Sequence, residues 1–433
     1  MTPELQIITA FGVFLFLLAA GMTVPFAITV PAIVYLLLQG GLVGLKGLGL
    51  VSWGSMDSFT LTAVPLFILM AEILQGSGLS QRIYTGLSKL FAGIPGGLLQ
   101  TNIAGCAVFA SISGSSVATA ASIGGVALPQ LLSRNYDRPL SAGSLAAGGT
   151  LGILFPPSLA MIVYGTFTET SVAKLFMAGL LPGIILTLMF MSYIGVHAWL
   201  RPGVAPRERG ARSIAEFVRA VAEVLPFAVL VGCTLGSIYA GLATPTEAAA
   251  IGCIMATIIS VIWGELNLRV LADCLRRSVA TIGNILFIIY AAFVFSYAIS
   301  YAGVGEQVTG FLVGLDLSRW EFFAALFVLY TVLGCLVESL GMIVITVPLL
   351  YPVLVKYGID PIWFGVILVM YIELGQISPP IGINLFVIQS IWKGKLSEVV
   401  MGTIPFHLIM FLLLALLMAF PQLAMWLPTH MNS

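Results

Sequence analysis

Two short stretches decide the fold of this chain: GILFPP at residues 152–157 and GQISPP at residues 375–380. Both lie inside long apolar runs, and both follow the pattern Gly-x-x-x-Pro-Pro. Proline removes a backbone donor and clashes with the preceding helical turn. Each Pro-Pro pair therefore predicts a helix that is broken near its middle, with backbone carbonyl groups left free for other partners.

The offset of 223 residues between these stretches aligns further residues of the two halves. The aligned residues are Pro129 with Pro352, Asp137 with Asp360, and Ser115 and Ser116 with Glu338 and Ser339. One constant offset through several such pairs indicates an internal duplication. Upstream of these residues the register drifts, so only part of each half is clearly repeated.

The composition of the chain excludes a soluble fold. Of its 433 residues, 59% are hydrophobic and 8% are charged, whereas soluble domains contain about 25% charged residues. The 18 Lys and Arg residues balance the 18 Asp and Glu residues, so there is no overall basic field for nucleic acid. The chain is therefore predicted to be an all-α integral membrane protein that binds no nucleic acid.

Apolar runs that could cross a bilayer occur at ten places, because a span needs about 20 mostly apolar residues. The predicted crossings are 5–20, 23–39, 61–76, 140–168, 174–198, 225–241, 246–263, 279–301, 361–391 and 403–427. Two further segments, 98–132 and 321–355, are interrupted near the middle by small or polar residues. Each is predicted to be a re-entrant hairpin whose tip is shielded from lipid by protein.

Basic residues orient the predicted spans. Residues 201–224 form the only long polar stretch and carry five arginines, so this connecting segment is predicted to be cytoplasmic. Fourteen loop Lys and Arg residues then fall inside and four outside, and both termini are periplasmic. The repeats 1–200 and 225–433 have five crossings each and are therefore inverted, with scaffold helices predicted in 5–76 and 225–301.

Inverted repeats with paired broken elements are typical of secondary transporters, whose sites lie near the bilayer midplane between the repeats. The predicted parts are the tip 111–116 with Thr119 facing the break 152–157, and the tip 338–341 facing the break 375–380 with Asn384. Free carbonyl and hydroxyl oxygens suit a hard cation such as Na⁺. Exposed helix N-termini suit a carboxylate.

These residues, with other motifs in the same order, resemble the large membrane subunit of tripartite ATP-independent periplasmic (TRAP) transporters. The resemblance covers nearly the whole chain. It rests on VPLFILMAEILQGSGL, PGG, FASISGSSVATAASIGGVALPQL, GTLGILFPPS, LFMAGLLPGI, TPTEAAA, GIDPIWFGVI and ELGQISPPIGINLFV.

The resemblance implies an elevator-type, Na⁺-driven importer in a bacterial inner membrane, with an outer scaffold and a moving domain that carries the hairpins and broken helices. It implies an organic-acid substrate such as a C4-dicarboxylate or sialic acid, captured by a periplasmic solute-binding protein. It also implies a small four-helix membrane subunit. Because residue 5 already begins the first predicted span, that subunit is expected as a separate chain. No organic cofactor and no transition-metal site are expected.

Carried over by motif, the resemblance places the site at the two tips and the two breaks. The predicted Na⁺-binding residues are Ser113, Gly114, Ser115, Ser116, Gly152, Pro156, Pro157, Glu338, Ser339, Gly341, Gly375, Ser378, Pro379 and Pro380. The predicted substrate-binding residues are Ser115, Ser116, Thr119, Ser339 and Asn384. Many relatives have Asp where this chain has Glu338, and the longer side chain changes the geometry of that ligand.

Structural interpretations compete for several other polar residues. Glu72 and Glu373 lie in or beside predicted spans, where a carboxylate needs a hydrogen-bond partner or water. Thr244 and Glu247 suit the cap of the helix that follows them. His407 is expected to be a packed or interfacial histidine.

Two other functions remain open. One is a stand-alone Na⁺/dicarboxylate symporter or antiporter that works without a soluble protein. The other is an intramembrane enzyme or assembly scaffold, in which the small residues only pack helices and the prolines are plain kinks. The sequence lacks a phosphate-binding Gly-Lys-Ser/Thr loop and a clustered His, Cys and Asp set, which disfavours an enzyme.

Overall fold

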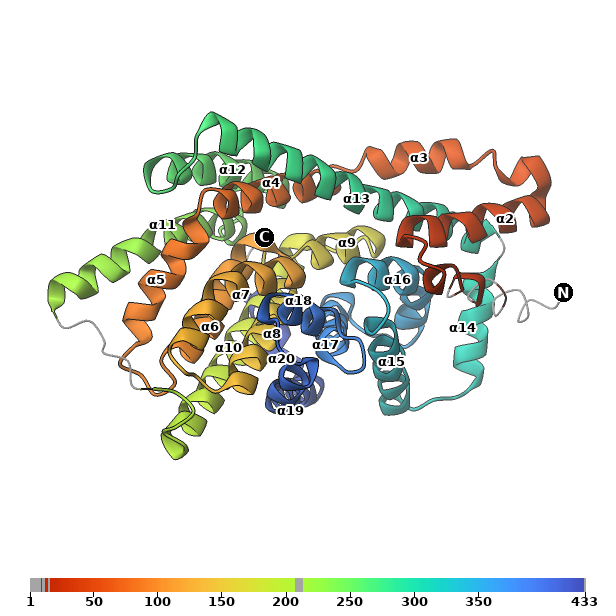
Figure 1. Cartoon of the computed structure of the whole chain (residues 1–433). Helices are drawn as coiled ribbons and strands as arrows, with labels where there is room; N and C mark the ends of the chain where they lie inside the picture. Colours follow the sequence, from red (N-terminus) through yellow and green to blue (C-terminus); the bar gives the residue numbers. More distant parts are fainter. Residues whose placement is uncertain (1–8, 10–11, 15, 207–212, 302, 432–433) are drawn as a thin grey trace.

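The computed structural model describes residues 9, 12–14, 16–206, 213–301 and 303–431, and within them every regular element is a helix (Figure 1). In chain order these are α2 (Val24–Gly44), α3 (Leu48–Met56), the short 3₁₀ turn η1 (Thr60–Thr62), α4 (Ala63–Gly76), α5 (Leu79–Phe91), α6 (Leu98–Ser113), α7 (Ser116–Ser133), α8 (Arg138–Leu154), α9 (Leu159–Phe167), α10 (Val172–Leu200), α11 (Ile214–Tyr239), α12 (Pro245–Ile262), α13 (Leu268–Tyr301), α14 (Val304–Gly314), α15 (Arg319–Gly334), α16 (Ser339–Lys356), α17 (Pro361–Ile377), α18 (Ile383–Trp392), α19 (Leu396–Ala419) and α20 (Gln422–His430).

Nine helices of the described residues are long and apolar enough to cross a membrane, or up to ten if the bent pair α3 and Thr60–Gly76 counts as one span. The two helices of that pair meet at an angle of 56°. The chain is therefore a multi-pass membrane protein, as its composition predicts. The predicted first span, 5–20, includes residues 5–8, 10–11 and 15, which lie outside the described part of the chain.

The two predicted hairpins and the two broken helices are present. Helices α6 and α7 form the first hairpin around Gly114 and Ser115, and α15 and α16 form the second around residues 335–338. Residues 155–158 separate α8 from α9, and residues 378–382 separate α17 from α18. Helices α7 and α16 begin 223 residues apart, and so do α8 and α17. The predicted all-α fold class is confirmed.

Equivalent aspartates begin the two broken helices. The Asp137 carboxylate accepts a hydrogen bond from the backbone N–H of Leu140, and Asp360 accepts hydrogen bonds from those of Ile362 and Trp363. Each aspartate is followed by a proline in the first helical turn, where the missing N–H costs no helical hydrogen bond. The same local chemistry therefore starts both elements, which explains why the internal offset stays constant here.

Several helices extend beyond the apolar segments that the sequence marks as spans. Helix α13 begins at Leu268 rather than at 279, and α11 begins at Ile214 inside the predicted polar segment 201–224. Residues 207–212 of that segment lie outside the described part. Hydropathy indicates where the chain leaves lipid, whereas backbone hydrogen bonds continue a helix into the aqueous layer. The predicted last span 403–427 is two helices, α19 and α20.

In Figure 1, one long layer contains α2, α3, α4, α12 and α13. The hairpins and broken helices lie together below this layer in the view. Within this layer, α13 packs against α2, α3 and α4, and α12 packs against α4. The division of the chain into a scaffold and a hairpin-bearing domain remains a prediction, but this layer contains most of the predicted scaffold segments.

A buried polar network joins α5, which the sequence did not mark as a helix, to α6 and α8. The hydroxyl of Tyr84 donates to Oδ1 of Asn102 at 2.9 Å, and Nδ2 of Asn102 donates to Oγ of Ser144 at 2.9 Å. All three side chains are fully buried. In low-dielectric surroundings such a network rigidifies the helices that it connects, provided that its members are satisfied.

We expect Asn102→Leu to lower the free energy of unfolding by about 1–3 kcal/mol, because the buried hydroxyl of Tyr84 loses its acceptor. The double variant Tyr84→Phe/Asn102→Leu should recover part of this loss. Thermal unfolding of the protein in lipid nanodiscs measures both effects. A single variant as stable as the parent chain would contradict the assigned network.

Candidate functional site

The first hairpin tip depends on a glycine. Gly114 has a φ of 60°, in the left-handed region, and Ser115 then returns to extended backbone and caps α7 by accepting a hydrogen bond from the N–H of Ala118. A methyl group on Gly114 would lie 2.5 Å from the carbonyl oxygen of Pro157. Glycine is therefore required both for the turn and for its close approach to the first break.

Hydroxyl groups of Ser113 and Thr119 form hydrogen bonds within the same turn. Oγ of Ser113 lies 2.7 Å from Oγ1 of Thr119, and Oγ1 of Thr119 lies 2.8 Å from the carbonyl oxygen of Ser115. The side chains of Ser113 and Thr119 are buried. Three oxygens thus lie close together at the tip, joined by hydrogen bonds to one another.

The first tip sits directly on the first break. The backbone N–H of Leu159 donates to the carbonyl of Gly114 at 3.3 Å, and a methyl group on Gly152 would overlap the carbonyl oxygen of Ser115. At the break, Oγ of Ser158 donates to the carbonyl of Ile153 at 2.6 Å. The predicted pairing of the tip 111–116 with the break 152–157 is therefore present in space.

A side chain from the second half of the protein reaches the first tip. Nδ2 of Asn384, in α18, donates to Oγ of Ser116 at 2.5 Å. Both side chains are buried, and Oδ1 of Asn384 has no hydrogen-bond partner among the described residues. The structure thus brings together two predicted substrate-binding residues that are 268 positions apart.

The two repeats interlock around this point. The second arm of each hairpin packs against the second half of the other repeat's broken helix: α7 against α18, and α16 against α9. The first hairpin also packs on its own broken helix through both arms, α6 and α7 on α8. The first break, residues 155–158, is buried by this arrangement, whereas Pro379, Pro380 and Ile381 of the second break are exposed.

Local hydrogen bonds and a close helix crossing hold the backbone at the second break. Oγ of Ser378 donates to the carbonyl of Leu374 at 2.7 Å, and the N–H of Gly382 donates to the carbonyl of Ser378 at 3.1 Å. A methyl group on Gly334 of α15 would lie 2.6 Å from Cα of Gly375. The second hairpin therefore approaches its break through the end of its first arm.

The second tip is not a copy of the first. Glu338 occupies the N-cap position of α16, but its side chain makes no capping hydrogen bond. A methyl group on Gly341 would lie 3.3 Å from Val24 of α2. Among the described residues, no hydrogen bond joins Glu338, Ser339 or Gly341 to the first tip or to either break. The Na⁺-binding roles of these three residues, like those of all the other predicted ligands, remain predictions.

Two side chains at the second break were not singled out as site residues from the sequence. Nε2 of His407 lies 3.3 Å from Oγ of Ser378, while its Nδ1 lies 3.1 Å from the carbonyl oxygen of Thr403. A carbonyl oxygen can only accept, so Nδ1 is the donor to Thr403. Nε2 lies beside the hydroxyl of Ser378, whose proton is already used in the hydrogen bond to Leu374. Gln376 is fully buried, with both amide atoms unpartnered. For Gln376, the sequence signal was its position within the Gly-x-x-x-Pro-Pro motif. No sequence signal indicated that His407 lies beside the second break.

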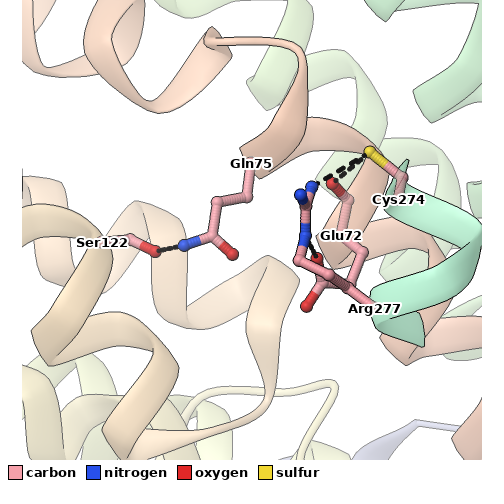
Figure 2. Close-up of polar contacts among 5 residues, drawn as sticks. All are labelled: Glu72, Gln75, Ser122, Cys274 and Arg277. Carbon is pink, nitrogen blue, oxygen red and sulfur yellow. Dashed lines mark hydrogen bonds and ion pairs between the residues drawn. The ribbon is translucent and has the colours of Figure 1, made fainter. Parts of the chain in front are cut away.

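Helix α4 of the long layer makes polar contacts with both α13 and the first hairpin, as Figure 2 shows. Oε2 of Glu72 accepts from Nε of Arg277 in α13 at 2.9 Å. One turn further on, the amide nitrogen of Gln75 donates to Oγ of Ser122 in α7. The structural interpretation of Glu72 is confirmed, and α4 connects α13 with α7, the second arm of the first hairpin.

Thr244 and Glu247 form the predicted helix cap. Oγ1 of Thr244 accepts from the N–H of Glu247 at 3.3 Å, and Oε2 of Glu247 accepts from the N–H of Thr244 at 2.8 Å. This reciprocal pair starts α12. The structural interpretation of both residues is confirmed.

Comparisons with known proteins agree with this architecture. The sequence profile described as "Tripartite ATP-independent periplasmic transporter, DctM component" matches residues 11–423. A C4-dicarboxylate TRAP transporter large permease protein of Pseudomonas aeruginosa is 31% identical over 89% of this chain and 90% of its own length. An isethionate TRAP transporter permease protein of Oleidesulfovibrio alaskensis is 30% identical over 96% of this chain. The match spans 65% of that protein's own length.

Among solved structures, the Alcanivorax borkumensis YdaH transporter, described as having an unusual topology, has a TM-score of 0.65 to this chain. The match covers 91% of this chain and 90% of that one at 15% sequence identity, which shows similarity of fold alone. The curated relatives are transporter permeases and not enzymes. The chain is a multi-pass inner-membrane protein that belongs to the DctM family, the large membrane subunits of tripartite ATP-independent periplasmic transporters.

Proposed function

We propose that this chain imports an organic-acid anion together with Na⁺, using the first tip and first break as the centre of the site. The observation that carries the proposal is the contact of Gly114 with Leu159, combined with the hydrogen bond from Asn384 to Ser116. One hairpin tip, one helix break and one residue of the opposite repeat meet there. Secondary transporters with inverted repeats bind their substrate and coupling ion at such a junction.

The chemistry of the tip supports Na⁺ as the coupling ion. Carbonyl and hydroxyl oxygens of Ser113, Ser115 and Thr119 lie close together in a buried turn, and hard cations prefer such ligands. Bound Na⁺ orders the tip, and the N-terminus of α7 beside it attracts the anion's carboxylate. An inside-negative potential contributes about 2.3 kcal/mol per net positive charge per 100 mV to inward movement.

Transport by this mechanism requires the hairpin-bearing helices to move relative to the long layer of α2, α3, α4, α12 and α13, as an elevator. The short polar contact between Gln75 and Ser122 is compatible with such movement, because one hydrogen bond is readily exchanged for another. In the proposed orientation both chain termini face the periplasm.

The proposed partners are a small four-helix membrane subunit and a periplasmic solute-binding protein that delivers the anion. Membership in the DctM family supports both. The greater length of the isethionate permease, named DctMQ, is consistent with a second membrane component in these systems. The proposed substrate is an organic acid of the C4-dicarboxylate or sialic acid type.

The test is uptake by proteoliposomes with a Na⁺ gradient. We expect Ser115→Ala and Ser116→Ala to raise the Na⁺ concentration for half-maximal uptake several-fold while membrane insertion remains normal. Ser133→Ala is the matched control, because its exposed hydroxyl lies in the same helix and bonds only the backbone of Gln130. Unchanged Na⁺ dependence in both tip variants would reject the assignment. Uptake without any soluble protein would instead favour a stand-alone symporter.

A further inference from the structure

A carboxylate and a carboxamide lie fully enclosed in α17, just before the second break. Glu373 and Gln376 are both 0% exposed. Within the part of the chain that the structure describes, neither oxygen of Glu373 and neither amide atom of Gln376 has a hydrogen-bond partner, and no salt bridge involves Glu373. A buried carboxylate with no partner is strongly unfavourable, so this side chain either holds a proton or pairs with a positively charged group from outside the described residues.

Helix geometry separates this pair from the second hairpin. Gly375 packs against Gly334 of α15, and the hydroxyl of Tyr371 donates to a carbonyl of the same helix. At about 100° per residue, Glu373 lies roughly 160° from both Gly375 and Tyr371. Gln376 is three residues from Glu373 and therefore shares its face. The pair points away from α15.

Two other contacts show what this face meets. A methyl group on Gly365 would contact Tyr164 of α9 and Leu175 of α10, and the indole N–H of Trp363 donates to the carbonyl of Leu417 in α19. Glu373 lies about 80° from each of these two α17 positions, between them. Helix α17 also packs against α8. The face that carries Glu373 is therefore covered by helices other than α15.

We propose that Glu373 and Gln376 bind a dehydrated alkali cation at a site separate from the hairpin tips. The carboxylate supplies the charge, and the unpartnered amide oxygen of Gln376 supplies a second hard ligand. The identification of the cation as Na⁺ rests on the proposed function. Each transport cycle then carries one positive charge more than the ions at the tips account for.

The experiment is equilibrium binding of ²²Na⁺ to the whole chain in lipid nanodiscs, with choline replacing Na⁺ as the competing salt. Glu373→Gln keeps the shape of the side chain and removes its charge, so it should bind one Na⁺ fewer per chain. Gln376→Leu should keep the number of bound ions and raise the half-saturating concentration several-fold. Glu265→Gln, an identical change on an exposed side chain, should leave both values unchanged.

Two results for Glu373→Gln would overturn the inference. One is a parental number of bound ions in Glu373→Gln. The other is a gain in thermal stability of Glu373→Gln that is equal in Na⁺ and in choline, since this would mean that a proton neutralises the enclosed acid. Loss of Na⁺ binding in Ser115→Ala but not in Glu373→Gln would overturn this inference and leave the proposed function intact. A parent chain that binds no Na⁺ would overturn both.

Discussion

Replacing Gly152 with alanine is expected to reduce Na⁺-driven uptake at least about 10-fold. The added methyl group would overlap the carbonyl oxygen of Ser115 and would approach Oγ1 of Thr119 to 2.7 Å. Both partners belong to the rigid turn of the first tip, so the hairpin must move away from the break. Overpacking of this kind typically costs about 1–3 kcal/mol, and a displaced tip also loses its oxygen geometry.

Gly125→Ala provides the control for this prediction. Gly125 lies in α7, the arm that follows the tip, and a methyl group there meets no atom within 4 Å. Alanine also favours a helix over glycine by about 0.5–1 kcal/mol, so this variant should be at least as stable as the parent chain and should transport normally. Uptake by proteoliposomes and thermal unfolding in nanodiscs measure the pair. Equal behaviour of the two variants would contradict the contact between tip and break.

Removing Arg277 is expected to destabilise the protein although this residue lies outside the proposed site. Arg277→Gln leaves the carboxylate of Glu72 without its partner on the apolar helix α4, with only 18% of that side chain exposed. An unpaired acid within a span costs about 2.5–3.5 kcal/mol on insertion scales, and the partial exposure of both side chains reduces this to about 1–3 kcal/mol. Protein yield in the membrane and thermal stability should both fall.

The double variant Glu72→Gln/Arg277→Gln tests the cause. Two neutral amides remove the unpaired charge, so stability should return to within about 1 kcal/mol of the parent chain. Figure 2 shows Gln75, three residues after Glu72 in α4, reaching Ser122 of the first hairpin. If Glu72 positions this part of α4, uptake in the single Arg277 variant should fall further than its protein yield does. A double variant as unstable as the single one would mean that Arg277 acts through packing alone.

The broken helices and hairpins could be predicted from the sequence because their causes are local. A Pro-Pro pair breaks the helix that contains it wherever that helix lies, and Asp137 and Asp360 cap their own first turns. Gly114 likewise takes a turn conformation that few other residues tolerate. Because these local signals recur at one constant offset, they also indicated a duplicated fold.

Other features depend on contacts between distant segments. The pairing of Ser116 with Asn384 needs α7 to pack against α18, and the position of His407 beside Ser378 needs α19 to cross the second break. The unlike environment of the second tip could not be predicted either, because an internal repeat aligns residues without stating which neighbours each copy meets.

By itself, the sequence determined that this is a membrane protein with duplicated, mid-span breaks, because composition and backbone stereochemistry act residue by residue. Only the tertiary structure decided which oxygens converge at the first tip and which polar groups stay enclosed without a partner. Glu373 illustrates the difference: its identity predicts a need for compensation, but helix packing alone shows that no hydrogen bond from its neighbours meets that need. Burial and partnership are properties of the surroundings, and the surroundings come from segments hundreds of residues away.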